Sequence, residues 1–398
     1  MRIAVVGCSH GALDDIYKAI HRVDADTKKS GQLPVELLLC CGDFQALRCN
    51  ADLYTMKAPT KFRLMKDFHN YYAGRKMAPI LTIVVGGNHE AMGHMWECFH
   101  GGWLAPNIYF LGYAGCVLVD GWLRVAGSSG IYKAEDYKKG YFERIPYIPS
   151  TLSSAYHTRQ YGVERLLKLN DNGAKVDIFM SHDWPVGIER HGDTQALLRE
   201  TPRLEMSIRS NTLGSKPLAS ILDKLKPMQW VSGHMHIRFT AEVHHKSDDS
   251  QSTKFLALSK PGAGREFLEV IEVPTPADRR PPNGTRSHTP ELFFDPQWLA
   301  IVRAFAPFMP LEVKAPPLPS VEEANALIEE ALQWVHQNIG TKPILEVQVF
   351  SQTAPPTRTS SGEDDKNVTP RSYTNPQTQA FCDMLGIQNH FAAGSLST

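Results

Sequence analysis

Residues 80–90 read Ile-Leu-Thr-Ile-Val-Val-Gly-Gly-Asn-His-Glu, an apolar run rich in β-branched residues that ends in two glycines and three polar side chains. Apolar runs of this length with such flanks are typical of buried strands. The carboxamide, imidazole and carboxylate of Asn88, His89 and Glu90 therefore stand where the chain leaves a strand. This stretch predicts a strand that carries chemically active side chains at its C-terminal end.

Four other segments have the same character, with imidazole, carboxylate or thiol side chains mostly just after an apolar run. They are Gly7-Cys8-Ser9-His10-Gly11, Gly42-Asp43, Ser181-His182-Asp183 and Gly233-His234-Met235-His236. In open α/β sheets, ligands bind at the C-terminal edge of the strands. Imidazole nitrogen together with carboxylate oxygen suits Zn, Fe or Mn, and two such ions can clamp a phosphate and activate a water. The pattern indicates a metal site that acts on a phosphate.

The rest of residues 1–273 alternates short apolar runs with helical patterns, which predicts an α/β sandwich. We expect strands near residues 3–6, 35–39, 80–85, 108–111, 123–126, 176–180, 229–231 and 255–258. We expect helices near residues 14–23, 60–73, 156–169 and 218–225.

Beyond residue 273 the composition changes, and five prolines between 274 and 290 indicate a linker. We expect a smaller C-terminal domain over about 285–350, with helices at 295–308 and 320–337, the second opened by the capping box Ser320-Val321-Glu322-Glu323. Residues 352–380 are poor in apolar side chains and are predicted to be disordered, and residues 381–387 to dock as a short helix.

Composition narrows the class of protein. The 398 residues are 42% hydrophobic and hold 42 basic and 42 acidic side chains, so attraction by bulk charge does not explain binding of a polyanion. No stretch approaches the ~20 uncharged apolar residues of a membrane span, and the apolar N-terminal run is too short for a signal peptide. Seven cysteines without a CxxC pair fit a reducing compartment.

Taken in order, the five segments resemble the motifs of the metallophosphoesterase (calcineurin-like) superfamily, which run D-x-H, G-D, G-N-H-[DE], H and G-H-x-H. Four are intact, and the first has Cys8 where the superfamily usually has Asp. With that departure, the chain resembles the family of RNA lariat debranching enzymes, strongly over 1–273 and more weakly beyond. The segments that carry this likeness include 42–48 (Gly-Asp-Phe-Gln-Ala-Leu-Arg), 127–132 (Gly-Ser-Ser-Gly-Ile-Tyr), 181–185 (Ser-His-Asp-Trp-Pro) and 294–300 (Phe-Asp-Pro-Gln-Trp-Leu-Ala).

The resemblance implies a metallophosphoesterase β-sandwich flanked by helices, with one or two divalent ions (Fe, Zn or Mn) per chain. One metal site corresponds to His10, Asp43 and His236, with Cys8 beside it. The other corresponds to Asp43, Asn88, His182 and His234. His89 corresponds to the catalytic histidine next to the leaving oxygen. The implied reaction is hydrolysis of the 2′-5′ phosphodiester at the branch point of excised intron lariat RNA, with a metal-activated hydroxide as nucleophile and linear intron RNA as product.

Cys8 is open to two interpretations: a small buried hydrophobe after a strand, or a neighbour of the metal. A thiol in place of a carboxylate weakens the site for Mg or Mn and favours Fe or Zn.

Residues 128–161, here called the recognition segment, interleave tyrosine with lysine and arginine. Tyrosine rings stack on splayed bases while cations meet phosphates, so we expect this segment to contact branched RNA. In the family it resembles a lariat-recognition loop. The candidate substrate residues are Ser128, Gly130, Tyr132, Lys133, Tyr137 and Lys139. Since lariats form where introns are spliced, the nucleus is the expected location.

Three alternatives remain at this point. A phosphoprotein phosphatase carries Gly-Asp-x-Val-Asp-Arg-Gly at the second motif, whereas this chain reads Gly-Asp-Phe-Gln-Ala-Leu-Arg from Gly42. Another phosphodiesterase of this fold, such as a DNA-repair nuclease, usually retains the first-motif Asp. A non-catalytic scaffold of the same fold loses metal-ligand histidines, which here all stand.

Overall fold

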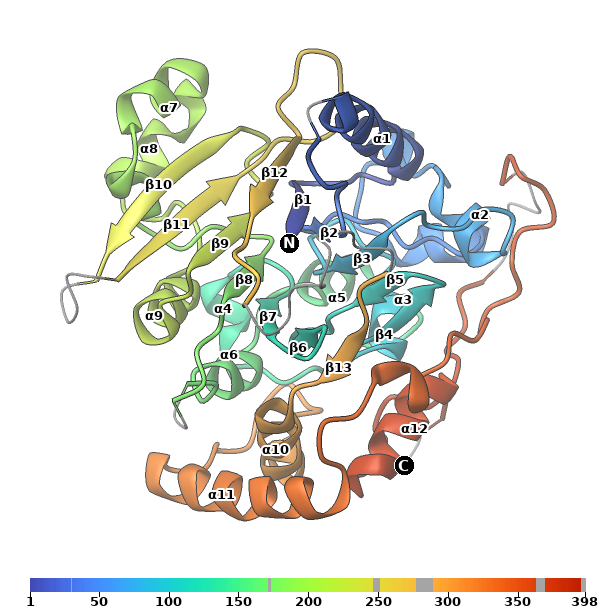
Figure 1. Cartoon of the computed structure of the whole chain (residues 1–398). Coiled ribbons are helices and arrows are strands. Elements are labelled where there is room, and N and C mark those ends of the chain that lie inside the picture. The colour runs from blue at the N-terminus through green and yellow to red at the C-terminus, as the bar shows by residue number, and fades with distance from the viewer. Residues whose placement is uncertain (30, 171–172, 246–250, 277–288, 363–368, 395–398) are drawn as a thin grey trace.

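Two β-sheets stack face to face, with helices over their outer faces (Figure 1). The computed structural model describes residues 1–29, 31–170, 173–245, 251–276, 289–362 and 369–394. Within this part of the chain, no helix is both long and apolar enough to cross a membrane. The two stacked sheets with flanking helices confirm the predicted α/β sandwich.

The first sheet has the order β12-β1-β2-β3-β5-β4, in which β1, β2, β3 and β5 run parallel and the two edge strands antiparallel. Its strands are β1 (Arg2–Val6), β2 (Leu37–Cys40), β3 (Leu81–Val84), β4 (Gly102–Ala105), β5 (Ile108–Phe110) and β12 (Leu268–Glu272).

The second sheet has the order β10-β11-β9-β8-β7-β6-β13, with a parallel centre formed by β11, β9, β8 and β7. Its strands are β6 (Ala114–Val119), β7 (Leu123–Ser128), β8 (Ile178–Ser181), β9 (Gln229–Ser232), β10 (Phe239–His244), β11 (Ser252–Ala257) and β13 (Leu292–Phe294).

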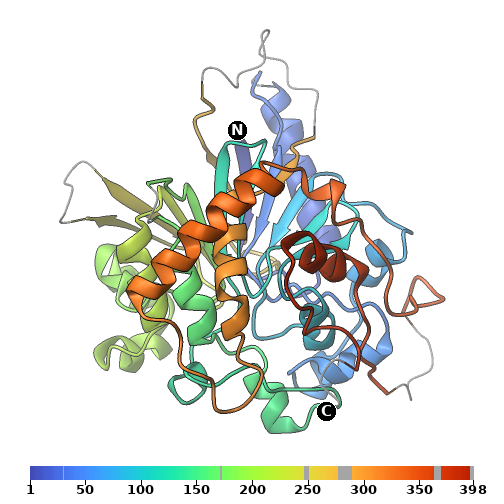
Figure 2. The ribbon, with the colours of Figure 1, turned by 90° about the horizontal axis from the view of Figure 1, so that it is seen from below.

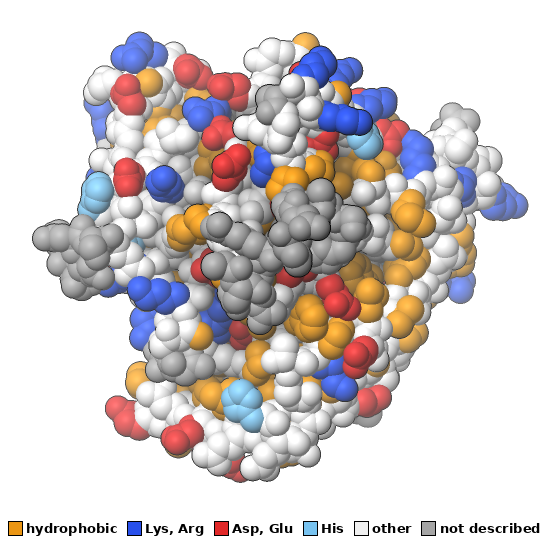
Figure 3. Space-filling model, viewed as in Figure 1, with side chains coloured by type: hydrophobic (Ala, Val, Ile, Leu, Met, Phe, Trp, Pro, Cys, Tyr) orange, Lys and Arg blue, Asp and Glu red, His pale blue; other side chains and the backbone are white. Residues whose placement is uncertain are grey.

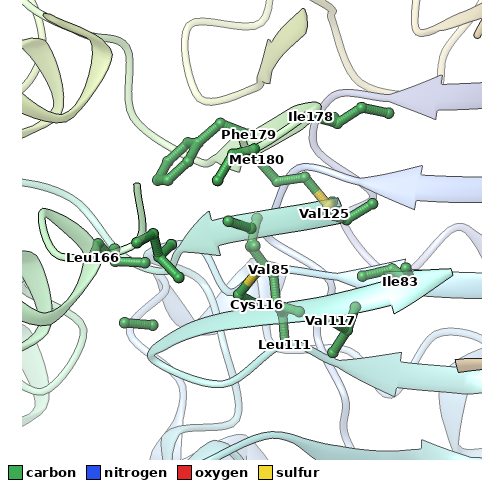
Figure 4. Close-up of a cluster of buried hydrophobic side chains, with 14 of the residues drawn as sticks. Ile83, Val85, Leu111, Cys116, Val117, Val125, Leu166, Ile178, Phe179 and Met180 are labelled. Carbon is green, nitrogen blue, oxygen red and sulfur yellow. The ribbon is translucent and has the colours of Figure 1, made fainter. Parts of the chain in front are cut away.

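Burial on both faces explains why the central strands read as unbroken apolar runs. In β1, Ile3 and Val5 belong to the core between the sheets, while Ala4 and Val6 pack with the helix after the strand. The sheets approach so closely that a Cβ on Gly127 would lie 2.8 Å from Val85 Cγ1. Figure 4 shows this core, with Ile83, Val85, Leu111, Val125, Ile178 and Met180 among its labelled side chains.

The helices are α1 (Leu13–Lys29), α2 (Phe68–Tyr72), α3 (Met92–Glu97), α4 (Ala134–Tyr137), α5 (Pro149–Ser154), α6 (Gln160–Leu166), α7 (Thr194–Glu200), α8 (Glu205–Arg209), α9 (Lys216–Leu225), α10 (Pro296–Phe305), α11 (Val321–Asn338) and α12 (Pro376–Leu385). The helix predicted at 60–73 is wrong over its first half, which holds only a short 3-10 turn, Thr60–Phe62. Phe62 and Leu64 are 58% and 51% exposed, so these apolar side chains do not contribute the packing that stabilises a helix.

The smaller C-terminal domain predicted over about 285–350 shares the main core of the sandwich within its described residues. β13 extends the second sheet by pairing with β6, and Trp298 and Leu299 of α10 lie in the same buried cluster as the sheets. Figure 2 shows α11 lying across α10 beneath the sandwich. One continuous hydrophobic core therefore serves both parts.

The expected disorder over 352–380 is not found in the described residues of that range. Tyr72 Oη donates to the Ala354 carbonyl at 2.8 Å, and Arg75 Nη2 donates to Thr357 Oγ1 at 2.7 Å. Gln377 in α12 accepts from the backbone N–H of Trp103 at 2.8 Å and donates to its carbonyl at 3.0 Å. Composition suggested disorder because these contacts use hydroxyl, guanidinium, amide and backbone groups rather than apolar side chains. Residues 363–368, also within that prediction, lie outside the described part.

A buried ion pair joins the C-terminal part to the sandwich and gives a stability prediction. Arg124 in β7 donates to both Asp295 oxygens, at 2.7 and 3.0 Å, and to Gln297 at 2.8 Å. Arg124→Ala leaves the Asp295 carboxylate buried without its cation, so we expect a loss of about 3–5 kcal/mol in unfolding free energy by urea denaturation. Arg209→Ala, which removes an exposed cation from α8, is the control and should change stability by less than about 0.5 kcal/mol. Equal changes in the two variants would contradict the assignment.

Candidate metal centre

The five motif segments meet at one edge of the sandwich. Three of them follow β1, β2 and β3, which are parallel neighbours in the first sheet. The other two follow β8 and β9, parallel neighbours in the second sheet. Because the C-terminal ends of parallel strands lie at the same edge, the sequence places all five groups together.

Backbone contacts lock these loops to one another. Ser9 N donates to the Gly42 carbonyl at 3.1 Å, and His10 N donates to the Asp43 carbonyl at 2.7 Å. His10, Asp43, His234 and His236 all have left-handed backbones, with φ of 44°, 48°, 64° and 58°. Such a conformation costs a non-glycine residue of order 1–3 kcal/mol and tends to collect at functional sites. Strain here marks positions whose side-chain direction is imposed.

Two glycines provide the space that these side chains need. A Cβ on Gly42, itself at φ +99°, would lie 2.3 Å from His182 Nδ1, and one on Gly87 would lie 2.3 Å from Asp43 Oδ1. Both approaches are far below contact distance. The glycines of the second and third motifs are therefore required by packing inside the site.

Cys8, His10, Asp43 and His236 form one group, in which one donor atom from each lies within 4.8 Å of the others. The Nε2 atoms of His10 and His236 are 3.0 Å apart, and His10 Nε2 lies 3.4 Å from Asp43 Oδ2. Two imidazoles and a carboxylate thus converge on one point.

Asn88, His182 and His234 gather on the other side of Asp43. His182 Nε2 lies 3.1 Å from Asn88 Oδ1 and 3.5 Å from Asp43 Oδ1, and the rings of His182 and His234 are 4.9 Å apart. Each Asp43 oxygen therefore faces one of the two groups, the arrangement that a carboxylate bridging two ions requires.

Hydrogen bonds fix the tautomers of two histidines. His182 Nδ1 donates to the Cys41 carbonyl at 2.7 Å, which leaves the Nε2 lone pair turned toward Asp43 and Asn88. His89 Nδ1 donates to the Lys57 carbonyl at 2.6 Å, while the His89 backbone N–H donates to Asp43 Oδ1 at 2.8 Å. Such outer hydrogen bonds orient metal-ligating and catalytic imidazoles.

The electrostatics favour a cation at this place. Burial lowers the pKa of His10 to about 4 and that of His236 to about 3, so both imidazoles are neutral near pH 7 and offer lone pairs. The neighbouring histidines hold the pKa of Asp43 below its ordinary range against the effect of burial, so it is a carboxylate. Neutral imidazoles around a buried anion fit a divalent ion.

Glu90 joins the loops of the second and third motifs through hydrogen bonds. Its Oε1 accepts from the N–H groups of Phe44 and Gly87 at 2.7 and 2.8 Å, and Oε2 accepts from Gln45 N at 2.8 Å. Burial and the charge of Asp43 raise the pKa of Glu90 to about 8, while the three amide donors oppose that rise. This side chain holds the second motif against the third and does not point at the metal groups.

Cys8 is fully buried, and its Sγ accepts a hydrogen bond from His234 N at 3.0 Å. Burial first, then the charge of Asp43, raises the pKa of the Cys8 thiol well above its usual value. Both interpretations of Cys8 therefore meet in one position, since the residue packs like a hydrophobe and lies beside the first metal group.

The recognition segment joins the centre through its backbone. Tyr132 N donates to Asp183 Oδ2 at 3.1 Å, and Asp183 directly follows His182. The Tyr137 ring packs edge-on against that of Tyr132, with centroids 5.6 Å apart. Lys133 is exposed beside them. The structure therefore places the Tyr132 backbone beside the residue that follows His182, with the Tyr137 ring packed on that of Tyr132.

Three candidate substrate residues need correction. Ser128 is 4% exposed, and Gly130 is buried where a Cβ would lie 2.0 Å from the Tyr156 carbonyl, so both shape the segment rather than contact RNA. Lys139 pairs with Asp136 at 2.7 Å and lines a separate cleft between α6 and the stretch that precedes α11. Spacing along the chain did not reveal which way these residues point.

Sequence reasoning did not assign roles to Gln45 and Lys57. Gln45 lies at the centre, with Nε2 3.5 Å from His10 Nδ1. Lys57 acts through its backbone carbonyl, which any residue supplies, so no sequence signal marks it. Gln45 lies two residues after Asp43 of the second motif. That closeness in sequence is the signal by which a role for Gln45 in the centre could have been predicted.

Comparison with known proteins agrees with this geometry. Residues 1–238 match the family described as calcineurin-like phosphoesterase, and residues 250–390 match the family described as lariat debranching enzyme, C-terminal domain. The lariat debranching enzyme of Arabidopsis thaliana is 43% identical over 97% of this chain and 86% of its own length. Those of Schizosaccharomyces pombe and Homo sapiens are 37% and 40% identical, over 98% and 97% of this chain and 96% and 69% of their own lengths.

The Glu90 contacts give a prediction about metal binding. In Glu90→Gln, an amide N–H₂ replaces one acceptor oxygen and faces a backbone donor, so the loops that carry Asp43 and Asn88 shift. We expect the affinity for Mn²⁺, measured by titration against a chelator, to fall about 10- to 100-fold, the usual effect of losing an outer-shell contact. Glu266→Gln, at a side chain 72% exposed, is the matched control. Unchanged affinity in Glu90→Gln would show that the three amide contacts do not position the ligands.

Proposed function

We infer that this chain, which belongs to the lariat debranching enzyme family, hydrolyses the 2′-5′ phosphodiester bond at the branch point of excised lariat RNA. It is a metal-dependent phosphodiesterase. The observation that carries this assignment is the placement of Asp43 between two groups of imidazoles, with His89 beside them, in a chain that matches debranching enzymes over almost its whole length. The products are a linear RNA with a 5′-phosphate and a branch nucleotide with a free 2′-hydroxyl.

His10, Asp43, His236, Asn88, His182 and His234 would hold the metal ions, with Cys8 beside the first group. When bound, the ions supply Lewis-acid stabilisation of phosphate charge and lower the pKa of a water. The protein contributes a rigid donor set, because four of these residues sit on constrained backbones and His182 has a fixed tautomer.

We propose that His89 protonates the leaving oxygen. Its Nδ1–H is committed to the Lys57 carbonyl, so Nε2 is the nitrogen that remains to exchange a proton. The ring is partly exposed, and its centroid lies 5.8 Å from that of His10. In its cationic form His89 donates from Nε2 to the departing 2′ oxygen and so offsets the charge that develops there.

The grip on RNA is local. Basic and acidic side chains are interspersed over the face in Figure 3, as a net charge of zero suggests. We propose that Tyr132 and Lys133 supply part of that grip, with the ring against a base and the ammonium on a phosphate. The hydrogen bond from the Tyr132 backbone N–H to Asp183, next to His182, supports this role.

We propose Fe or Zn ahead of Mn as the native ions, since the sulfur of Cys8 stands where the superfamily has a hard carboxylate. We also propose the nucleus as the place of action, because lariats arise where introns are spliced.

The test of function compares cleavage of a synthetic 2′-5′ branched RNA, its linear 3′-5′ counterpart and a phosphopeptide, with metal analysis of the same preparation. We expect selective cleavage of the branch. His89→Ala should lower kcat by about 10²- to 10⁴-fold and keep the metal content, because His89 serves proton transfer. His21→Ala, at an exposed position of α1, is the control. Preference for the phosphopeptide would overturn the assignment, and loss of metal in His89→Ala would place His89 among the ligands.

The recognition role of Tyr132 and Lys133 is tested by comparing two substrates. Tyr132→Ala and Lys133→Ala should each weaken binding of branched RNA about tenfold, roughly the value of one stacked base or one desolvated phosphate contact. Hydrolysis of bis(p-nitrophenyl) phosphate, which has no base or second phosphate to contact, should change much less. Lys138→Ala is the control. Lys138 is an exposed lysine of the same segment, but it lines the cleft near α6. Equal losses on both substrates would show that the two residues act through the metal centre.

A further inference from the structure

A second basic and aromatic segment contacts His89 through a backbone carbonyl. Residues 53–66, here called the β2–α2 segment, carry four cations (Lys57, Lys61, Arg63 and Lys66) and no carboxylate. They also expose large apolar side chains, with Tyr54 48%, Phe62 58% and Leu64 51% exposed. Cations interleaved with exposed rings on one short segment are what a single-stranded nucleic acid site requires.

Two adjoining clefts run along this segment. The first, of about 550 Å³, lies between the β2–α2 segment and the stretch 146–152 of the recognition segment, and Lys57 is among its walls. The second, of about 560 Å³, is lined by Leu64, Lys66 and Gly362 among others. Tyr54 and Arg63 line both clefts, so the two adjoin, and together they are here called the groove.

The groove is electropositive as well as open. Among the described residues that line either cleft, there is no Asp or Glu. Arg63 Nε donates to the Ala58 carbonyl at 2.9 Å, which fixes the guanidinium on the wall. In the described part of the chain no carboxylate pairs with Arg63. A fixed cation without an acidic partner is suited to a phosphate.

The groove begins at the metal centre. Lys57, on its wall, is the residue whose carbonyl accepts from His89 Nδ1. At the other cleft, Lys66 packs beside the first motif, where a Cβ on Gly11 would lie 2.7 Å from Lys66 Cβ. The groove and the metal centre are therefore adjacent along the chain elements that line them.

We propose that the groove binds a single-stranded arm of the branched RNA, with a base stacked on the Tyr54 ring and phosphates on Arg63, Lys57 and Lys66. The proposal rests on the proposed function, since it takes that RNA as substrate. Charge complementarity favours this occupant: among the described residues that line the groove, three basic side chains face no carboxylate and match a phosphate backbone. Tyr132 and Lys133 are proposed to contact RNA near the branch. The groove would bind further nucleotides, which lie beyond the branch.

The test uses the full chain and two branched RNAs that share the same branch point, one with single-nucleotide arms and one with long arms. In Tyr54→Ala and Arg63→Gln, affinity for the long-armed RNA should fall about tenfold or more, by loss of a stacked base or of one phosphate contact. The short-armed RNA should lose much less. Arg63→Gln should also reduce the slope of log affinity against log salt by about 0.7, the value of one phosphate contact with a single strand.

Conservative and distant variants separate recognition from folding. Tyr54→Phe keeps the ring and should retain affinity for the long-armed RNA, while thermal unfolding checks that Tyr54→Ala remains folded. Two variants outside the groove serve as controls. Met206→Ala removes an apolar side chain that is 81% exposed on α8, and Lys29→Ala removes an exposed cation at the end of α1. Equal losses on long- and short-armed RNA, or no loss on either, would overturn the groove assignment.

Failure of the groove and failure of the function give different results. If the wild-type chain cleaves neither branched RNA, the proposed function is wrong, and binding of a linear single-stranded RNA still tests the groove. If it cleaves both at the same efficiency and the variants do likewise, the function holds and the groove proposal is wrong. If the long-armed RNA binds more tightly to the wild type and the excess is lost in Tyr54→Ala and Arg63→Gln, the proposal holds.

Discussion

The structure depends on one buried carboxylate. Asp43 is 1% exposed, and its two oxygens face His10 on one side and His182 on the other. An isolated buried charge is costly, so it persists only where neighbouring groups compensate it. Here the compensation comes from the His89 amide, from imidazoles of both sheets and from the cations those imidazoles are arranged to bind. The requirement that two sheets deliver ligands to one aspartate fixes how their C-terminal edges meet.

The remainder of the chain holds that edge rigid through other buried charges. Arg48 is almost fully buried and donates to Asp52, Glu97 and Thr353, so it ties the loop after the second motif to α3 and to the C-terminal segment. Arg124 ties β7 to the start of α10 in the same way. Removing one partner of such a pair leaves an uncompensated charge, which is why these contacts resist local opening. The C-terminal part thus stabilises the sheets that carry the site, with which it shares one core.

Much of the fold and of the centre could be predicted from the sequence because both follow local rules. Apolar runs such as 80–85 and 176–180 gave strands close to β3 and β8, and Ser320 does cap α11 by accepting from Glu323 N. The order of the five motifs then implied one edge. What could not be predicted depends on long-range packing: the edge strand β13 of three residues, the burial of Ser128, and the tail that docks on backbone carbonyls. The helix expected at 60–73 failed because apolar spacing does not reveal whether a core lies within reach.

The irregular backbone at 60–66 bears on the proposed recognition of a branch. A branch point joins three RNA strands at one nucleotide, so an enzyme that reads it must hold chain on more than one side of the reacting phosphate. The recognition segment is attached next to His182 through Tyr132 and Asp183, and the β2–α2 segment is attached to His89 through the Lys57 carbonyl. Each segment proposed to contact RNA is therefore hydrogen-bonded to one of the five motif segments. Since the second attachment sets the ring of His89, strand binding in the groove and orientation of the catalytic imidazole share one structural element.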